Sequence, residues 1–322
     1  MDEYLKRLEA FAKKHSLLSK GLKIGVAVSG GPDSVFMLTL LNALSKEYLL
    51  NLTVLHFNHK LREEADEEEA FVKELADSLG CPFLKGECDV MAFSRQNRLS
   101  LEDGARRKRY EFFCNARSRL NLDVIATGHT KDDVAETLLI NLFRGSSTDG
   151  LSSLKPKRGF FIRPILVFEK QEIVSFLKER NIPYKTDKSN SDTHFKRNMI
   201  RLKLMPILKQ INPNIIDTLF RNSMIMAEES LFLKEIAERE FVRSTTITSN
   251  RAIIDTTNLN TSNAILKRIL NMAVKRLINS EYNLSFHNTE RLLEVLTKGK
   301  SLTLRKLIKA YKKGNRLIIE KL

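Results

Sequence analysis

The sequence predicts an α/β protein: a parallel sheet with helices on both faces, followed by a smaller α+β unit. Over residues 22–180, short apolar runs rich in β-branched residues alternate with stretches whose apolar residues recur at helical spacing. This alternation is typical of parallel strands joined by crossover helices. Glycine-containing and polar motifs follow the predicted strands, at the edge where such sheets bind ligands. The length of 322 residues favours two domains.

The first domain is expected to begin with a charged, helix-like segment, MDEYLKRLEAFAKKH. Strands are expected at 22–28, 52–57, 83–86 and 123–127. Helices are expected at 33–46, 63–79, 101–120, 131–143 and 170–179. Strands and helices in this order predict a Rossmann-like parallel sheet.

The pattern changes after Pro164, and a turn signal, INPN at 211–214, precedes a long amphipathic helix that ends near Arg243. The domain boundary is therefore placed near Asn212, which gives domains at 1–212 and 213–322. The last part of the chain is expected to be a small, mostly helical α+β unit. Its helices are expected near 263–279 and 286–297, and its strands at 251–255 and within 302–319.

Composition argues against several classes of protein. No stretch approaches the length of a membrane span, and the charged start is unlike a signal peptide. The cysteines Cys81, Cys88 and Cys114 form no paired motif, which fits a reducing cytoplasm. The 54 basic and 39 acidic residues give a formal charge of +15. This excess favours nucleic acid as a partner, although an ordinary basic surface would give the same sum.

Basic residues concentrate at the end of the sequence. Between Thr297 and Leu322 nine basic residues accompany one acid, Glu320. They are Lys298, Lys300, Arg305, Lys306, Lys309, Lys312, Lys313, Arg316 and Lys321. The apolar residues expected to bury one side of this unit are Leu302, Leu304, Leu307, Ile308, Leu317, Ile318 and Ile319. The charge on the other side predicts a surface for nucleic-acid phosphates, whose contacts position a ligand without specifying its sequence.

A glycine-rich loop separates the first strand from the helix that follows it. It consists of Ser29, Gly30, Gly31, Pro32, Asp33 and Ser34. The glycines let the backbone approach a phosphate closely, and the N–H groups at the helix start face it. The loop lacks the lysine of the Walker sequence, G-x-x-x-x-G-K-[ST]. Asp33 cannot attract phosphate directly, so it suggests a bridging Mg²⁺. The structural alternative is a tight strand-to-helix turn.

Four ionisable residues crowd the start of the helix after the fourth strand, within GHTKDDVAET at 128–137. They are His129, Asp132, Asp133 and Glu136, and the three acids share a broad helical face. One acid at a helix start is commonly a cap, but four ionisable groups exceed what capping needs. Such a cluster can hold Mg²⁺ and an ammonium group, and the histidine can orient or relay a proton.

Two further motifs supply candidate ligand-binding residues. In HFNHKLR at 56–62, His56 is expected to line a nucleotide cleft rather than to form a metal pair with His59, since no third ligand is near. In LEDGARRKRY at 101–110, Arg106 and Arg109 lie one helical turn apart. Arginine forks suit phosphate or carboxylate, and the alternative is a solvated basic helix face.

The S-G-G-x-D-S loop resembles the phosphate loop of the PP-loop ATP pyrophosphatase superfamily. Seven motifs occur in the order and approximate spacing seen in the tRNA(Ile)-lysidine synthase family, within residues 25–201. They are SGGPDS, HFNHKLR, EDGARRKRY, ATGHTKDDVAET, FRGSSTDGL, IRPIL and TDKSNSDTHFKRNMIR. The resemblance implies the PP-loop ATPase fold. It also implies a ligase that uses ATP and Mg²⁺ to attach L-lysine to the wobble cytidine of tRNA(Ile) with a CAU anticodon.

The resemblance also implies roles for individual residues. The catalytic residues would be His129, Asp133 and Arg201. The ATP site would comprise residues 29–34 with His56 and Gly128, and Asp33 and Asp132 would bind Mg²⁺. The lysine and substrate pocket would comprise Glu136, Asp187, Asn190, Arg106 and Arg109. The second domain resembles the family only loosely, and its basic residues, not the resemblance, predict a linker helix and a small basic tRNA-binding unit at 213–322.

Three other classes share parts of this pattern. A tRNA thiolase of the same superfamily is the nearest alternative, but such enzymes usually need cysteines in paired motifs. An amidating ligase would give no reason for the basic end of the chain. A basic RNA-binding module without catalysis would leave the acidic cluster without a purpose. The sequence leaves the oligomeric state open, and a homodimer is one arrangement that it allows.

Overall fold

The computed structural model describes residues 1–60, 64–152, 154–186, 196–257, 259, 261–279, 284–304 and 307–322. The chain divides into two compact units, residues 1–227 and 228–322. The division falls inside helix α11 (Ile215–Ser244), whereas the sequence places the boundary near Asn212, before this helix. The cause is that α11 serves two cores: Ile216 packs in the first unit, and Phe241 packs in the second.

The first unit is built on a six-stranded sheet in the order β3-β2-β1-β4-β6-β5. Its strands are β1 (Lys23–Ala27), β2 (Asn51–Asn58), β3 (Phe83–Glu87), β4 (Val124–Thr127), β5 (Lys157–Arg158) and β6 (Phe161–Ile162). All neighbours pair in parallel except β5 with β6. The four strands expected from the sequence and their parallel pairing are confirmed. The two extra strands, of two residues each, are too short to produce a hydrophobic period.

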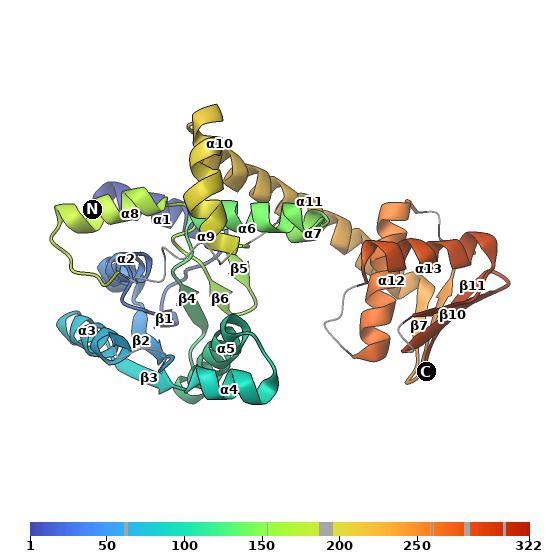
Figure 1. Cartoon of the computed structure of the whole chain (residues 1–322), viewed down its shortest axis with the longest axis horizontal. Coiled ribbons are helices and arrows are strands. Elements are labelled where there is room, and N and C mark those ends of the chain that lie inside the picture. Colours follow the sequence, from blue (N-terminus) through green and yellow to red (C-terminus); the bar gives the residue numbers. More distant parts are fainter. Residues whose placement is uncertain are drawn as a thin grey trace. The chain divides into compact units, whose positions relative to one another are not determined.

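Helices cover both faces of this sheet. The described helices of the first unit that precede α11 are α1 (Asp2–Lys14), α2 (Pro32–Tyr48), α3 (Glu64–Ser78), α4 (Val90–Asn97), α5 (Leu101–Leu120), α6 (Lys131–Phe143), α7 (Thr148–Leu151), α8 (Lys170–Glu179), α9 (Lys196–Met199), η2 (Ile200–Leu204) and α10 (Met205–Ile211). Figure 1 shows α1, α2 and α8 on one side of the sheet and α4 and α5 on the other. Adjacent residues of β2 divide accordingly, since Val54 packs with the first group and Leu55 packs with α5.

An aromatic cluster fixes the helix that carries the glycine-rich loop. The ring of Phe36, in α2, lies 5.9 Å from Tyr4 of α1, 5.1 Å from Phe168 and 5.0 Å from Phe176 of α8, all edge to face. The three phenylalanines are fully buried. Each buried ring of this kind contributes about 1.5–3 kcal/mol to folding. The start of α8 is therefore held against α2, a few residues from the loop.

The second unit is an antiparallel five-stranded sheet in the order β7-β8-β11-β10-β9, whose core is shared with α12, α13 and the last part of α11. Its elements are β7 (Thr245–Ile247), β8 (Arg251–Asp255), α12 (Asn263–Ile278), α13 (Phe286–Lys298), β9 (Leu302–Leu304), β10 (Ile308–Lys313) and β11 (Arg316–Lys321). The α+β class is confirmed, with a larger share of strand than the sequence suggests. Among the helices of the described ranges, none is long and apolar enough to cross a membrane.

Two expectations about the basic end of the chain are wrong. Leu307, expected to be buried, is 50% exposed because it lies in the turn between β9 and β10. In β11 burial alternates, so Leu317 and Ile319 enter the core, and Ile318 lies between them on the partly exposed outer face. Arg305 and Lys306 lie outside the described residues.

Candidate active site

The glycine-rich loop joins β1 to α2 and is fixed by its own side chains. Gly30 has φ +89°, which favours glycine, and Gly31 is the N-cap of α2. The hydroxyl of Ser34 donates a hydrogen bond to Gly31 O (2.9 Å) and accepts one from Ser29 N (3.1 Å). Pro32 stands in the first turn of α2, where its missing N–H costs nothing. The result is a preformed loop at the start of a helix, a geometry suited to anions.

Gly128 follows β4 and lies directly against this loop. A Cβ atom added to Gly128 would sit 3.2 Å from Asp33 C, Ser34 Cα and Ser34 N. All three are backbone atoms, which cannot rotate away as a side chain can. A glycine is therefore favoured here, because the end of β4 approaches the first turn of α2 closely.

We expect Gly128→Ala to displace the loop by a few tenths of an ångström. The free energy of unfolding should fall by about 1–2 kcal/mol, as for other overpacked sites, and affinity for a nucleoside triphosphate should fall with it. Urea unfolding and calorimetric titration measure the two effects. Gly31→Ala is a control for stability, because φ is −72° there and the nearest atom to an added Cβ, Ser29 Oγ, is 3.6 Å away. Equal stability of Gly128→Ala and the parent would contradict the steric argument.

The carboxyl group of Asp33 is buried at the end of the loop. Its Oδ1 accepts no hydrogen bond from any described residue. Burial raises the pKa of Asp33 to about 7; the charges of Asp133 and Asp132 add to the rise, and Lys170 opposes it. A buried carboxyl group with a raised pKa and an oxygen without a hydrogen-bond partner is typical of a site where a bound cation stabilises the charged form.

These residues fit a Mg²⁺ ion that takes part of its ligands from a substrate. Mg²⁺ is usually bound through one or two carboxylates together with phosphates and water. Within the described ranges, no group of three His, Cys, Asp or Glu residues could hold a metal by itself. Asp132, the second expected ligand, uses Oδ2 to accept a hydrogen bond from Lys170 N (2.8 Å).

Asp133 lies one residue further along α6 and is held in its charged form. Its Oδ2 accepts hydrogen bonds from the N–H (2.9 Å) and hydroxyl (3.1 Å) of Thr130, the N-cap residue. Its Oδ1 accepts one from Lys170 Nζ (2.9 Å). Burial by itself would raise the pKa of Asp133, but Lys170, His129 and the Thr130 N–H hold it well below its usual range. Asp133 is thus a carboxylate at every ordinary pH.

His129 stands between β4 and α6 beside this carboxylate. Its Nδ1 lies 3.0 Å from Thr127 Oγ1. Burial lowers the pKa of His129 to about 4; Asp133 opposes the shift, and Arg163, Arg197 and Arg109 add to it. The imidazole is therefore neutral at pH 7.

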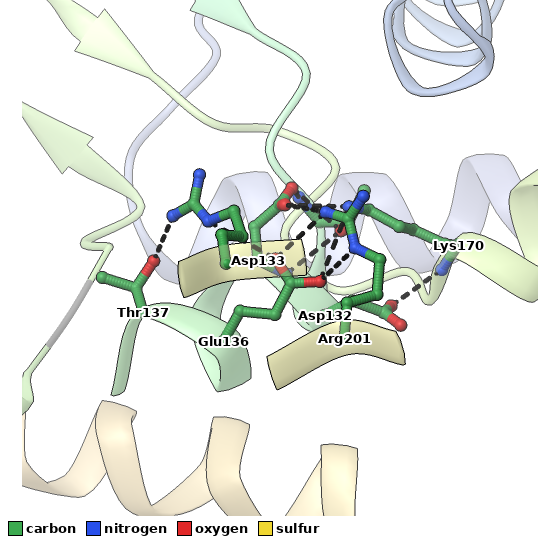
Figure 2. Close-up of polar contacts among 8 residues, drawn as sticks. Asp132, Asp133, Glu136, Thr137, Lys170 and Arg201 are labelled. Carbon is green, nitrogen blue, oxygen red and sulfur yellow. Dashed lines mark hydrogen bonds and ion pairs between the residues drawn. The ribbon is translucent and has the colours of Figure 1, made fainter. Parts of the chain in front are cut away.

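Glu136, one turn further along α6, is 2% exposed and forms the centre of an ion-pair network (Figure 2). Its two oxygens accept hydrogen bonds from Arg201 Nε (2.7 Å) and Nη2 (3.0 Å). Arg197 Nε lies 3.4 Å from Glu136 Oε2, and Arg197 Nη2 donates to Thr137 Oγ1 (2.8 Å). The structure thus brings Glu136 and Arg201 together, but through a direct pair that the sequence does not predict.

Sequence reasoning missed two cations of this network, Lys170 and Arg197. A signal exists for Arg197. Four crowded carboxylates require compensating positive charge, and the spacing R-N-x-x-R puts Arg197 and Arg201 on one helical face. No comparable pattern points to Lys170, which reaches the cluster from the start of α8. Asp187 and Asn190, expected in the same pocket, lie outside the described residues.

A cavity of about 260 Å³ adjoins the loop at the ends of β1 and β2. Its lining includes Ser29, His56 and Arg109. His56 is buried and its Nδ1 donates a hydrogen bond to Val28 O (2.9 Å), and burial lowers its pKa. Arg109 therefore belongs to the cavity lining, whereas Arg106 does not. Both residues are exposed, and the Arg106 guanidinium lies 5.6 Å from the centre of the Tyr110 ring.

Fold and site together define a nucleotide-binding α/β protein whose phosphate loop carries an aspartate in place of a lysine and faces an acidic helix start. Similarity to known proteins supports this class. The profile of the PP-loop domain matches residues 2–208. The tRNA(Ile)-lysidine synthase of Geobacter sulfurreducens is 38% identical over 257 residues, which cover 79% of this chain and 54% of that protein. The one from Petrotoga mobilis is 35% identical over 226 residues, which cover 70% of this chain and 73% of that protein.

The chain therefore belongs to the tRNA(Ile)-lysidine synthase family of PP-loop proteins. It spans about half to two thirds of the length of most of the curated relatives that it matches. Among solved structures, the U34-tRNA thiolase NcsA from Methanococcus maripaludis aligns with a TM-score of 0.60 at 17% identity, over 70% of this chain and 78% of that one. This likeness supports the fold alone.

Proposed function

We propose that this protein is a ligase that uses ATP to activate the wobble cytidine of tRNA(Ile) with a CAU anticodon and then attaches L-lysine to it. The products would be lysidine, AMP and pyrophosphate. The observation that carries the proposal is the juxtaposition of a lysine-free phosphate loop with a buried acidic cluster, in which Asp133 binds the cation Lys170 and an oxygen of Asp33 has no hydrogen-bond partner among the described residues. Membership of the family supports it.

In the first step the C2 oxygen of cytosine attacks the α-phosphorus of ATP. An oxygen–phosphorus bond forms, and the bond from the α-phosphorus to the bridging oxygen of pyrophosphate breaks. The N–H groups at the start of α2 would stabilise the phosphate charge. Mg²⁺ bound at Asp33, with Asp132, would neutralise further charge on the phosphates. The cytidine must be unstacked to reach the site, which costs a few kcal/mol.

In the second step the ε-amine of lysine attacks C2. A carbon–nitrogen bond forms, and the carbon–oxygen bond to AMP breaks. The ε-ammonium has a reference pKa near 10.4, so it must lose a proton before attack. Asp133 would bind the ammonium, and the neutral ring of His129 would accept a proton. Glu136 and Arg201 would shape the pocket.

The decisive experiment is a product assay with purified protein, ATP, Mg²⁺ and tRNA(Ile), in the presence and absence of lysine. Pyrophosphate and AMP should form in equal amounts, and the tRNA should gain the mass of one lysine only when lysine is present. Formation of ADP and phosphate would contradict the proposal. A tRNA that gains sulfur when a sulfur donor is supplied would favour the thiolase instead.

The second unit is the proposed site of tRNA binding away from the anticodon. Lys309, Lys313 and Arg316 are exposed on β10 and β11. Arg316 is paired with Asp255 (3.8 Å), so the two lysines carry more of the uncompensated charge. Lys312, by contrast, donates to Leu296 O (2.8 Å) at the end of α13.

We expect Lys309→Ala combined with Lys313→Ala to weaken binding of every tRNA. The slope of log affinity against log salt should fall by roughly one unit per lost phosphate contact. Filter binding between low and moderate salt measures the slope. Lys312→Ala is the matched control on the same strand, and ATP binding should be the same in all variants. An unchanged slope would leave the arginines near Arg106 as the better candidates.

A further inference from the structure

Lys170 brings to the loop a cation that the loop itself lacks. It is the first residue of α8, and its Nζ lies 2.9 Å from Asp133 Oδ1 and 4.0 Å from Glu136 Oε1. Burial raises the pKa of Asp33, and the positive charge of Lys170 opposes this rise. The ammonium group therefore lies among the acids that face the phosphate loop.

The position of Lys170 is fixed by contacts from three helices. Its backbone N–H donates to Asp132 of α6 (2.8 Å). Glu169 and Glu172 form a capping box at the start of α8, with Glu169 N 2.8 Å from Glu172 Oε2. Arg7 of α1 donates to the other oxygen of Glu172 (2.6 Å). Such supporting contacts are typical of side chains whose location matters for a site.

Lys170 is a cation of this network that has donors to spare. Arg201 binds Glu136 through two hydrogen bonds, and Arg197 is tied to Glu136 and Thr137. Within the described residues, Lys170 Nζ donates one hydrogen bond, to Asp133, although an ammonium group has three protons. Its side chain is 25% exposed. A flexible stem with spare donors can reach an oxygen that arrives beside Asp33.

Four acids lie near the loop: Asp33, Asp132, Asp133 and Glu136. Without a cation they would repel a triphosphate bound there. Arg197 and Arg201 lie against Glu136, and Arg201 comes within 3.8 Å of Asp133, whereas Lys170 lies 2.9 Å from Asp133. Lys170 can therefore offset these acids together with a bound Mg²⁺.

We propose that Lys170 binds phosphate oxygens of ATP and stabilises the departing pyrophosphate. The inference rests on the proposed function for the identity of the substrate. Lys170 would donate hydrogen bonds to the β- and γ-phosphate oxygens as charge develops on pyrophosphate, with no proton transferred and no change of oxidation state. AMP, which lacks these phosphates, would not need the contact.

The test compares binding of ATP with binding of AMP to the full chain in Mg²⁺ by calorimetric titration. Lys170→Met should raise the Kd of ATP at least about tenfold, equivalent to about 1.4 kcal/mol, and leave the Kd of AMP within about twofold. Lys170→Arg should restore most of the ATP affinity. Lys131→Met is the matched control, because Lys131 is also a paired lysine at the start of a helix, but it pairs with Asp217 (3.0 Å) and Glu169 (3.8 Å) rather than with Asp133 and Glu136. Lys170→Gln replaces the methionine variant if that variant does not fold.

Pyrophosphate release in the presence of tRNA supplies the second readout. Lys170→Met should reduce release even when ATP is saturating. Equal losses of ATP and AMP affinity, or no loss of either, would overturn the inference. So would normal pyrophosphate release with only lysine transfer impaired, since Lys170 would then serve the lysine pocket. If the parent protein binds ATP but forms no lysidine, the proposed function fails, and the ATP-to-AMP comparison still decides the role of Lys170.

Discussion

Replacing Asp133 with Asn is expected to lower the rate of lysidine formation by about a thousandfold, the scale on which general acid–base and electrostatic groups act. The asparagine keeps the size of the side chain and an oxygen for the Thr130 N–H (2.9 Å in the parent). It loses the negative charge that binds Lys170. We propose that the same charge binds the ammonium group of the substrate lysine. Turnover of wobble cytidine to lysidine, followed by mass spectrometry of tRNA digests, measures the effect.

The fold of this variant should survive at a cost of about 1–3 kcal/mol, because a buried ionic hydrogen bond is weakened while the N-cap contacts remain. Asp217→Asn is the control for removal of one negative charge near α6, since Asp217 is half exposed and pairs with Lys131 outside the site. It should retain nearly normal turnover. A properly folded Asp133→Asn protein that forms lysidine at the parent rate would remove Asp133 from the catalytic residues.

The sequence predicts the long elements of the first unit well because their signals are local. The helix expected at 101–120 is α5 (Leu101–Leu120), and the one expected at 170–179 is α8 (Lys170–Glu179). Each combines helical spacing with a recognisable start, such as the Ser100 cap of α5. Short elements such as α7 (Thr148–Leu151) escape prediction because one helical turn carries no period.

The network around Glu136 could not be predicted in the same way because it depends on contacts between distant segments. Sixty-five residues separate Glu136 from Arg201. The sequence shows an acidic cluster and a pair of arginines, but their meeting requires α9 and η2 to pack against α6. Likewise, Gly128 is expected from the sequence as part of the ATP site, whereas the reason for a glycine, its close approach to the Asp33 backbone, is visible only in three dimensions.

The three cysteines do not support the thiolase alternative. Cys81 is buried, Cys88 is half-buried and Cys114 is exposed on α5, and all three are free. Burial raises the pKa of the Cys81 thiol, which disfavours a nucleophilic thiolate. The similarity to NcsA extends to the fold alone, at 17% identity. The acidic cluster and neutral His129 suit an incoming amine better than a sulfur carrier.

Substitutions of Glu136 and Arg201 can distinguish a structural role of this ion pair from a role in the lysine pocket. Arg201→Met should lower the free energy of unfolding by about 2–4 kcal/mol, because it leaves a carboxylate that is 2% exposed without its bidentate partner. This loss of unfolding free energy is smaller than for a fully buried ion pair, because the Arg201 side chain is 27% exposed. Urea unfolding measures the loss.

The double variant Glu136→Leu with Arg201→Met should recover most of this stability, since apolar residues often replace a buried ion pair without loss. A double-mutant cycle should give a coupling energy of about 1–3 kcal/mol. Lysidine formation should nevertheless stay at least about a hundredfold below the parent, because the restored core lacks the carboxylate proposed to shape the lysine pocket. Recovery of both stability and turnover would show that the pair serves only to hold α6 against η2, and it would leave Asp133 as the acid that receives the substrate amine.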